Sequence, residues 1–220
     1  MPPSQAATLL LDLDGTLVDS APDLAACLNR RLAAHGLAPL ALADVVAMIG
    51  DGVGALLQRG FAARGTAPDT AALPDFMADY AAHLADATRP YPGAAAALAQ
   101  LAGAGWRIGV CTNKPEALAR DLLAATGLLP AIAAIGGGDS FPVRKPDPGH
   151  VRATLARAGG DPARAVMAGD HRNDVLAAHG AGLPCVFAAW GYGTPDMATG
   201  AAAIADRFAD LPALVARLLP

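Results

Sequence analysis

The sequence predicts an α/β fold, a doubly wound parallel sheet with a Rossmann-like core, into which a small all-helical domain is inserted. Short apolar runs of strand length alternate with helix-length segments over most of the chain, as is typical of βαβ units. Polar residues follow several of these runs directly, and right-handed crossovers bring such positions to one edge of a parallel sheet. Residues 20–88 show no strand-like alternation, which predicts the helical insertion.

Composition limits the classes of function. The 220 residues suffice for one mid-sized domain with an inserted lobe. With 16 Lys+Arg against 20 Asp+Glu, the chain offers no broad basic face for nucleic acid. Gly and Pro interrupt the longest uncharged stretch, residues 1–7 lack the basic region of a signal peptide, and the three cysteines are widely spaced. We therefore expect a cytoplasmic protein that binds neither nucleic acid nor membranes, as a monomer or a homodimer.

The first strand is predicted at an apolar run that begins at Leu9 and ends in two carboxylates, Asp12 and Asp14. Alternate residues of a strand share a face, so both acids are expected to point the same way at the carboxyl end of the strand. Gly15 then breaks the strand. Two neighbouring acids without a nearby base indicate a metal site.

The inserted segment is predicted to hold about four helices. Ser20 resembles a helix N-cap, with Asp23 three residues on as in a capping box. Helical spacing covers residues 20–34, 42–49, 53–64 and 71–87. A rigid Pro-Tyr-Pro-Gly turn then returns the chain to the sheet. The predicted domains are an α/β core of residues 1–17 and 89–220 and a helical domain of residues 18–88.

The remaining segments predict four more strands and a closing helix over residues 211–219. The strand ranges are 106–111, 131–135, 165–168 and 184–188. Polar residues lie where strands stop or on an adjoining loop: Thr112, Asn113, Lys145, Asp170 and Asp174. Together with the first two acids they predict one pocket, in which carboxylates hold Mg²⁺ and a lysine binds a phosphoryl group.

Four segments resemble the motifs of the haloacid dehalogenase-like superfamily of phosphohydrolases. They are LLLDLDGTLVDS, VCTN, the RKP around Lys145, and GDHRND from Asp170 to Asp174. The resemblance covers nearly the whole chain, and the helical insertion is similar to the small cap domain of that family.

The resemblance implies roles for the acids. Asp12 is expected to be the nucleophile that forms an aspartyl-phosphate. Asp14 is expected to protonate the leaving group and then to take a proton from the attacking water. The Asp12 carboxylate, the Asp14 backbone carbonyl and Asp170 are expected to bind Mg²⁺.

The resemblance also implies how the phosphoryl group is held. Thr112, Asn113 and Lys145 are expected to bind its equatorial oxygens and to stabilise charge in the transition state. Asp174 is expected to orient Lys145 or a metal-bound water.

Two further stretches, LVDSAPDL and IGDGVGALL, are similar to phosphoglycolate phosphatases. The second is a glycine-rich loop of the cap. Backbone N–H groups at Gly50, Asp51 and Gly52 are expected to meet the carboxylate of a small substrate, here 2-phosphoglycolate.

Several alternatives stay open at this stage. Phosphatases of the same cap type act on sugar phosphates, nucleotides or pyrophosphate, and a sugar-phosphate mutase shares the motifs. Asp14 argues against a haloalkanoate dehalogenase, and the absence of lysine from residues 18–88 argues against a phosphonatase. Outside this class, Gly50, Gly52 and Ala55 loosely fit the fingerprint of a dinucleotide-binding module, although helical spacing precedes them. A non-catalytic protein of the same fold is disfavoured by the acid pair.

Overall fold

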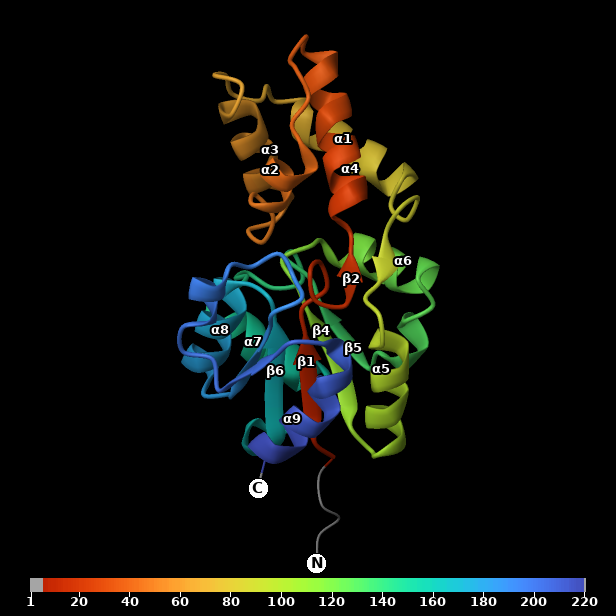
Figure 1. Ribbon diagram of the computed structural model, residues 1–220, viewed down its shortest axis with the longest axis vertical. Helices are drawn as coiled ribbons and strands as arrows, with labels where there is room; N and C mark the ends of the chain where they lie inside the picture. Colours follow the sequence, from red (N-terminus) through yellow and green to blue (C-terminus); the bar gives the residue numbers. More distant parts are fainter. Residues whose placement is uncertain (1–5, 220) are drawn as a thin grey trace, which may run out of the picture.

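The computed structural model describes residues 6–219, and its centre is a six-stranded sheet in which all neighbouring strands are parallel (Figure 1). The strand order is β5-β4-β1-β6-β7-β8. The bounds are β1 (Thr8–Leu11), β4 (Arg107–Cys111), β5 (Ala134–Gly136), β6 (Ala165–Gly169), β7 (Cys185–Ala188) and β8 (Ala203–Ala205). After β1 the chain adds β4 and β5 on one side, and it then adds β6, β7 and β8 on the other side. The strand order therefore reverses beside β1, which is where doubly wound sheets bind ligands. The predicted fold class is confirmed.

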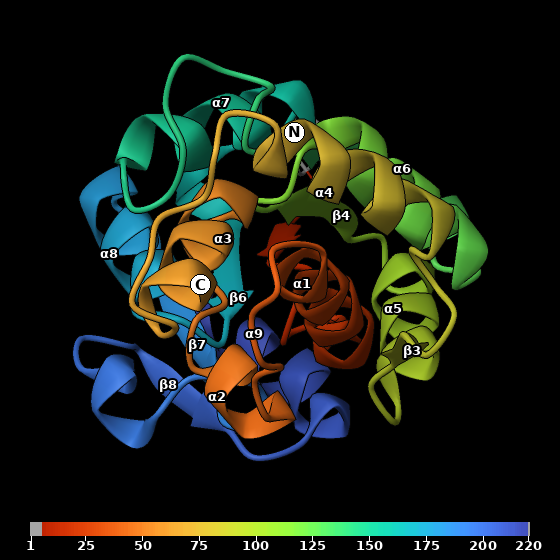
Figure 2. The same cartoon turned by 90° about the horizontal axis from the view of Figure 1, so that it is seen from above.

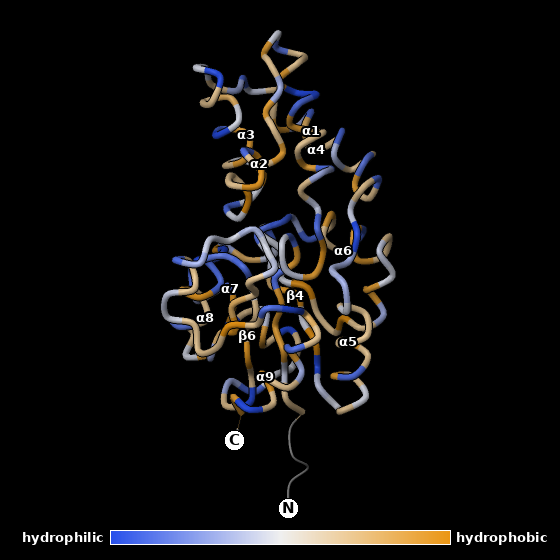
Figure 3. Tube along the Cα trace, viewed as in Figure 1, coloured by the Kyte–Doolittle hydropathy of each residue, from blue (hydrophilic) through white to orange (hydrophobic). Residues whose placement is uncertain are grey.

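Helices cover both faces of the sheet and bury it. They are α5 (Ala94–Gly103), α6 (Glu116–Ala125), α7 (Pro148–Arg157), α8 (Arg172–Ala181) and α9 (Leu211–Leu218). Alternation along β1 divides the core, because Leu9 and Leu11 pack with α5, α6 and α9 whereas Leu10 packs with α7 and α8. All four residues of β1 are buried, and Figure 3 shows apolar residues, in orange, along β4 and β6 as well as in the helices.

The inserted helices lie beyond the carboxyl end of the sheet (Figures 1 and 2). They are α1 (Ala21–Ala34), α2 (Leu42–Val46), α3 (Val53–Ala62) and α4 (Ala72–Ala82). Phe61, Phe76 and Tyr80 are completely buried among them. Two short antiparallel strands, β2 (Val18–Asp19) and β3 (Arg89–Pro90), carry the chain into and out of this segment. The domain bounds at residues 18 and 88 stay a prediction.

The capping box predicted at Ser20 is wrong. Ser20 precedes α1, but its hydroxyl donates to Asp14 Oδ1 at 2.5 Å and does not cap the helix. Asp23 instead accepts hydrogen bonds from the backbone N–H groups of Ala87 and Thr88 and from the Thr88 hydroxyl. Its carboxylate therefore links the first turn of α1 to the chain just before β3, where the inserted segment ends.

Other predicted bounds also shift. The helices predicted over residues 42–49 and 71–87 end earlier, at Val46 and Ala82. The strand predicted over residues 131–135 begins later, at Ala134, because a short 3₁₀ turn (Leu129–Ala131) precedes it. Strand β8 was not predicted, since three residues of an alanine-rich stretch carry no periodic signal. Within residues 6–219, no helix is long and apolar enough to cross a membrane.

Candidate active site

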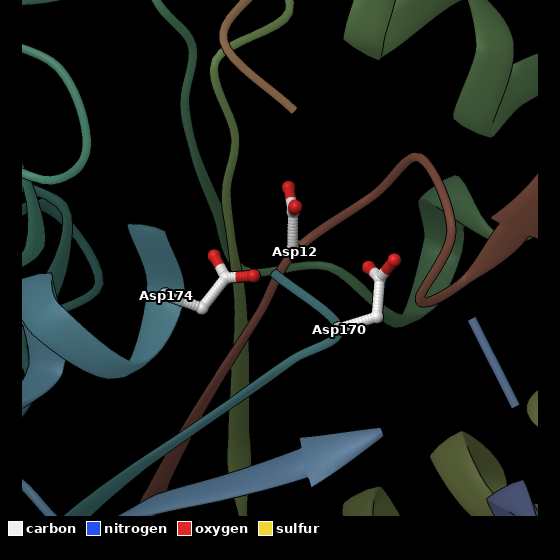
Figure 4. A group of neighbouring side chains, drawn as sticks. All are labelled: Asp12, Asp170 and Asp174. Carbon is white, nitrogen blue, oxygen red and sulfur yellow. The ribbon is translucent and has the colours of Figure 1, made fainter. Parts of the chain in front are cut away.

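Three carboxylates converge at the carboxyl ends of β1 and β6 (Figure 4). Asp12 follows β1, Asp170 follows β6, and Asp174 lies in the first turn of α8. One oxygen of each carboxylate lies within 4.8 Å of the others. The Asp12 backbone N–H donates to the Ala168 carbonyl at 3.0 Å, which continues the pairing of β1 with β6 and holds the acids side by side.

Local hydrogen bonds aim Asp174 at this group. His171 caps α8, accepting from the Asn173 N–H at 3.2 Å, while Asp174 Oδ2 accepts from the His171 N–H at 3.0 Å. This reciprocal capping box fixes the first turn of the helix. His171 therefore has a structural role as the cap of α8.

Lys145 links two of the acids. Its Nζ lies 2.9 Å from Asp12 Oδ1 and 2.6 Å from Asp174 Oδ1, with 1% of its side chain exposed. Burial alone would lower the pKa of Lys145, but the carboxylates of Asp12 and Asp174 raise it, so the lysine stays charged. Asp174 thus has a protein partner at each oxygen, Lys145 at Oδ1 and the His171 N–H at Oδ2.

Asp170 has partners from the opposite side. Its carboxylate accepts from the Thr16 hydroxyl at 2.7 Å and from the Tyr192 N–H at 2.8 Å. Gly15, with φ +85°, leaves room for this carboxylate, because a Cβ there would lie 2.3 Å from Asp170 Oδ2. Burial, reinforced by Asp12 and Asp174, raises the pKa of Asp170 to about 8.

The cluster has the character of a divalent cation site. Burial raises the pKa of Asp12 to about 6 although Lys145 opposes the shift. Three buried carboxylates thus face a single lysine, which leaves them short of positive charge. The donors are all oxygen atoms, as hard divalent cations prefer. The residues therefore fit a hard divalent metal ion.

The second predicted acid, Asp14, belongs to a different group of contacts. Asp14 Oδ1 accepts from the Ser20 hydroxyl at 2.5 Å and lies 3.1 Å from Lys114 Nζ, which also donates to the Tyr80 hydroxyl at 2.7 Å. Asp12 and Asp14 thus pair with different lysines. The carboxylate of Asp14 lies outside the three-acid cluster.

A cavity lies between the sheet and the inserted helices, and the two acids of the first motif line it. The other lining residues of the α/β core are Thr112, Asn113 and Lys114. From the inserted segment come Leu24 of α1, Val53 and Leu56 of α3, and Ile49, Gly50 and Gly52 of the loop between α2 and α3. The structure thereby brings most of the predicted site residues to one space. Lys145, Asp170 and Asp174 lie behind the lining.

The glycine loop contacts the α/β core through backbone and side-chain atoms. The Gly50 carbonyl accepts from Asn113 Nδ2 at 2.9 Å and from Asn173 Nδ2 at 3.3 Å. Asn113 Nδ2 also donates to the Lys145 carbonyl at 3.0 Å. Asp51 does not line the cavity with its side chain, which bonds to Asn173 and Arg59.

Sequence reasoning missed several residues of the site. Thr16 and Tyr192 donate hydrogen bonds to Asp170, and the hydroxyl of Tyr80 accepts a hydrogen bond from Lys114. Lys114 had a detectable signal, because it and Lys145 are the chain's two lysines and it directly follows the VCTN motif. Nothing local in the sequence distinguishes either tyrosine.

Comparison with known proteins gives concordant results. The family model "haloacid dehalogenase-like hydrolase" matches residues 6–182. Phosphoglycolate phosphatase of Caulobacter vibrioides is 45% identical over 97% of this chain and 92% of its own length, and that of Rhodospirillum rubrum is 46% identical over 92% and 88%.

Solved structures agree. A predicted phosphoglycolate phosphatase from Haemophilus somnus superimposes with a TM-score of 0.88 at 31% identity, covering 96% of this chain and 98% of its own. CbbY from Rhodobacter sphaeroides, solved in complex with phosphate, gives a TM-score of 0.80 at 25% identity, covering 94% and 96%. The chain belongs to the haloacid dehalogenase-like hydrolases, in the phosphoglycolate phosphatase family.

Proposed function

We propose that this protein is a Mg²⁺-dependent phosphatase that hydrolyses 2-phosphoglycolate to glycolate and phosphate through a phosphorylated Asp12. The observation that carries the proposal is the position of Asp12, which lies in a buried acidic cluster beside Lys145 and also lines the cavity under the inserted helices. The names of the relatives support the substrate.

Asp12 and Asp170, with the Asp14 backbone carbonyl, would hold the Mg²⁺. When bound, the ion offsets the repulsion between these carboxylates and a phosphate dianion. The raised pKa values of Asp12 and Asp170 support this assignment, because both groups lack sufficient positive charge in the protein alone.

Asp12 would act as the nucleophile. Its Oδ1 accepts from the Leu13 N–H at 2.7 Å and pairs with Lys145, which fixes the carboxylate and favours its ionised form. An Asp12 oxygen then forms a bond to phosphorus as the bond from phosphorus to the glycolate oxygen breaks. Lys145 would supply positive charge beside the nucleophile from behind the cavity lining, and Thr112 offers a hydroxyl from the cavity wall to the phosphoryl oxygens.

Asp14 would move the protons. It donates one to the glycolate oxygen as that oxygen leaves, and later takes one from the water that attacks the phosphorylated Asp12. The Ser20 hydroxyl holds Asp14 Oδ1 in place at 2.5 Å. The side chain is 14% exposed and lines the cavity, so it has access to the leaving group.

Residues 18–88 would form the cap that selects the substrate. The Gly50 carbonyl docks on Asn113 and Asn173, which holds the glycine loop against the cavity. In that position, backbone N–H groups from Gly50 to Gly52 would receive the carboxylate of 2-phosphoglycolate.

The experiment is a phosphate-release assay in Mg²⁺ on wild-type protein and the Asp12→Asn variant, with Asp121→Asn as control because Asp121 is exposed on α6. We expect Asp12→Asn to lose about 10³-fold or more and the control to keep full activity. Substantial activity of Asp12→Asn would exclude the covalent role. A metabolite screen that ranked 2-phosphoglycolate well below hexose phosphates or nucleotides would exclude the substrate.

A further inference from the structure

The cavity that the proposed substrate would enter has a single cationic side chain in its lining. Of the residues between 6 and 219 that line it, Lys114 alone is positively charged, while Lys145 lies behind the wall. The opposite wall is apolar, formed by Leu24, Ile49 and Val53 among others. A ligand with a second negative charge therefore finds one place where that charge can be paired.

Contacts from both parts of the molecule hold Lys114 in place. The residue follows β4 in the α/β core, and Nζ lies 3.1 and 3.4 Å from the two oxygens of Asp14. From α4 of the inserted segment, Tyr80 contributes its hydroxyl at 2.7 Å and its ring face, whose centroid is 4.4 Å from Nζ. The side chain is 2% exposed, so its charge acts in a region of low dielectric.

The covalent structure of the substrate brings its carboxylate to this lysine. Asp14 would contact the oxygen that bridges phosphorus and carbon, and the carboxylate is two covalent bonds away from that oxygen. A cation bonded to Asp14 is therefore adjacent to the carboxylate whenever the phosphoryl group is over Asp12. An ammonium group has three N–H donors, and Asp14 and Tyr80 accept two of them, which leaves one for a further oxygen.

We propose that Lys114 binds the carboxylate of the substrate and selects for phosphate esters that carry an anionic group next to the ester oxygen. This inference rests on the proposed function and deepens it. Lys114 provides the charge, and the N–H groups of the glycine loop provide neutral donors on the facing side. A substrate with a neutral hydroxymethyl group in place of the carboxylate offers no negative charge to the remaining N–H donor of the lysine.

The test compares two substrates that differ only in this group, 2-phosphoglycolate and 2-hydroxyethyl phosphate. The readout is the ratio of their kcat/KM values, in which any effect of a substitution on Asp14 or on the fold cancels. We expect Lys114→Met to lower this ratio by about 30- to 100-fold relative to wild type, mostly through KM for 2-phosphoglycolate. Lys114→Arg, which keeps the charge, should retain a clear preference for the carboxylate.

A second pair of variants guards against a folding defect. Lys114→Gln keeps hydrogen-bond donors without the charge and should lower the ratio as Met does. Tyr80→Phe removes the hydroxyl partner but keeps Lys114 and should leave the ratio within about threefold of wild type.

The outcomes separate this inference from the function on which it rests. If wild type prefers 2-phosphoglycolate and the Met and Gln variants keep that preference, the role of Lys114 is excluded while the proposed function stands. If wild type has no preference for the carboxylate, both the proposed substrate and the inference are excluded. Equal loss on both substrates would reduce Lys114 to a support for Asp14.

Discussion

Replacing Lys145 with methionine removes the positive charge from the acidic cluster at nearly constant side-chain length. The lysine pairs with Asp12 Oδ1 at 2.9 Å and with Asp174 Oδ1 at 2.6 Å, and all three side chains are at most 11% exposed. Breaking a buried pair from one side typically costs 3–5 kcal/mol, because the remaining charge stays buried. We therefore expect Lys145→Met to lower the free energy of unfolding by about 4 kcal/mol at pH 7.5 without metal.

The cost should depend on pH with a definite sign. Burial already raises the pKa of Asp12 to about 6, and Lys145 opposes that shift, so removing the lysine raises the pKa further. A raised carboxylate pKa favours the folded state at low pH, and this stabilisation is lost as pH rises through the folded-state pKa. The destabilisation caused by Lys145→Met should thus be distinctly smaller at pH 5 than at pH 7.5.

Urea unfolding in EDTA at the two pH values measures both quantities. Arg172→Met is the matched control, because Arg172 pairs with Asp196 at 2.7 Å on the surface, with side chains 54% and 69% exposed. Exposed pairs contribute about 0–1 kcal/mol. A cost for Lys145→Met as small as that of the control, or the same cost at both pH values, would refute the reasoning.

Two further predictions concern the proposed metal site. Because the pKa of Asp170 is raised to about 8, the free energy of unfolding of the metal-free protein should fall from about pH 4 to pH 8. The rise in Tm on adding Mg²⁺ should grow over the same pH range. A rise in Tm that does not depend on pH would contradict this. Gly15→Ala should weaken Mg²⁺ binding and activity at least tenfold, because the new Cβ would lie 2.3 Å from Asp170 Oδ2. Gly36→Ala, equally at positive φ but with nothing within 4 Å, is its control and should affect stability alone.

Local pattern determined the fold class and the first acid pair. The strand β1 and the helices of the insertion follow from apolar runs and helical spacing. Both patterns are formed by residues that are close together in the chain. The expected meeting of Asp12 with Asp170 and Asp174 follows from the topology of parallel sheets. Strand β8 escaped prediction because three residues hold too little pattern.

Pairing among charged groups was decided by tertiary structure. The sequence predicts Lys145 in one pocket with both acids of the first motif, but it does not indicate that Lys145 pairs with Asp12 while Lys114 pairs with Asp14, 100 positions away. Ser20 illustrates the same limit, because its spacing fits a helix cap whereas its hydroxyl is taken by Asp14. Spacing along the chain reports which face a side chain takes, but partners so distant in sequence are fixed by how the elements pack, which no local pattern encodes.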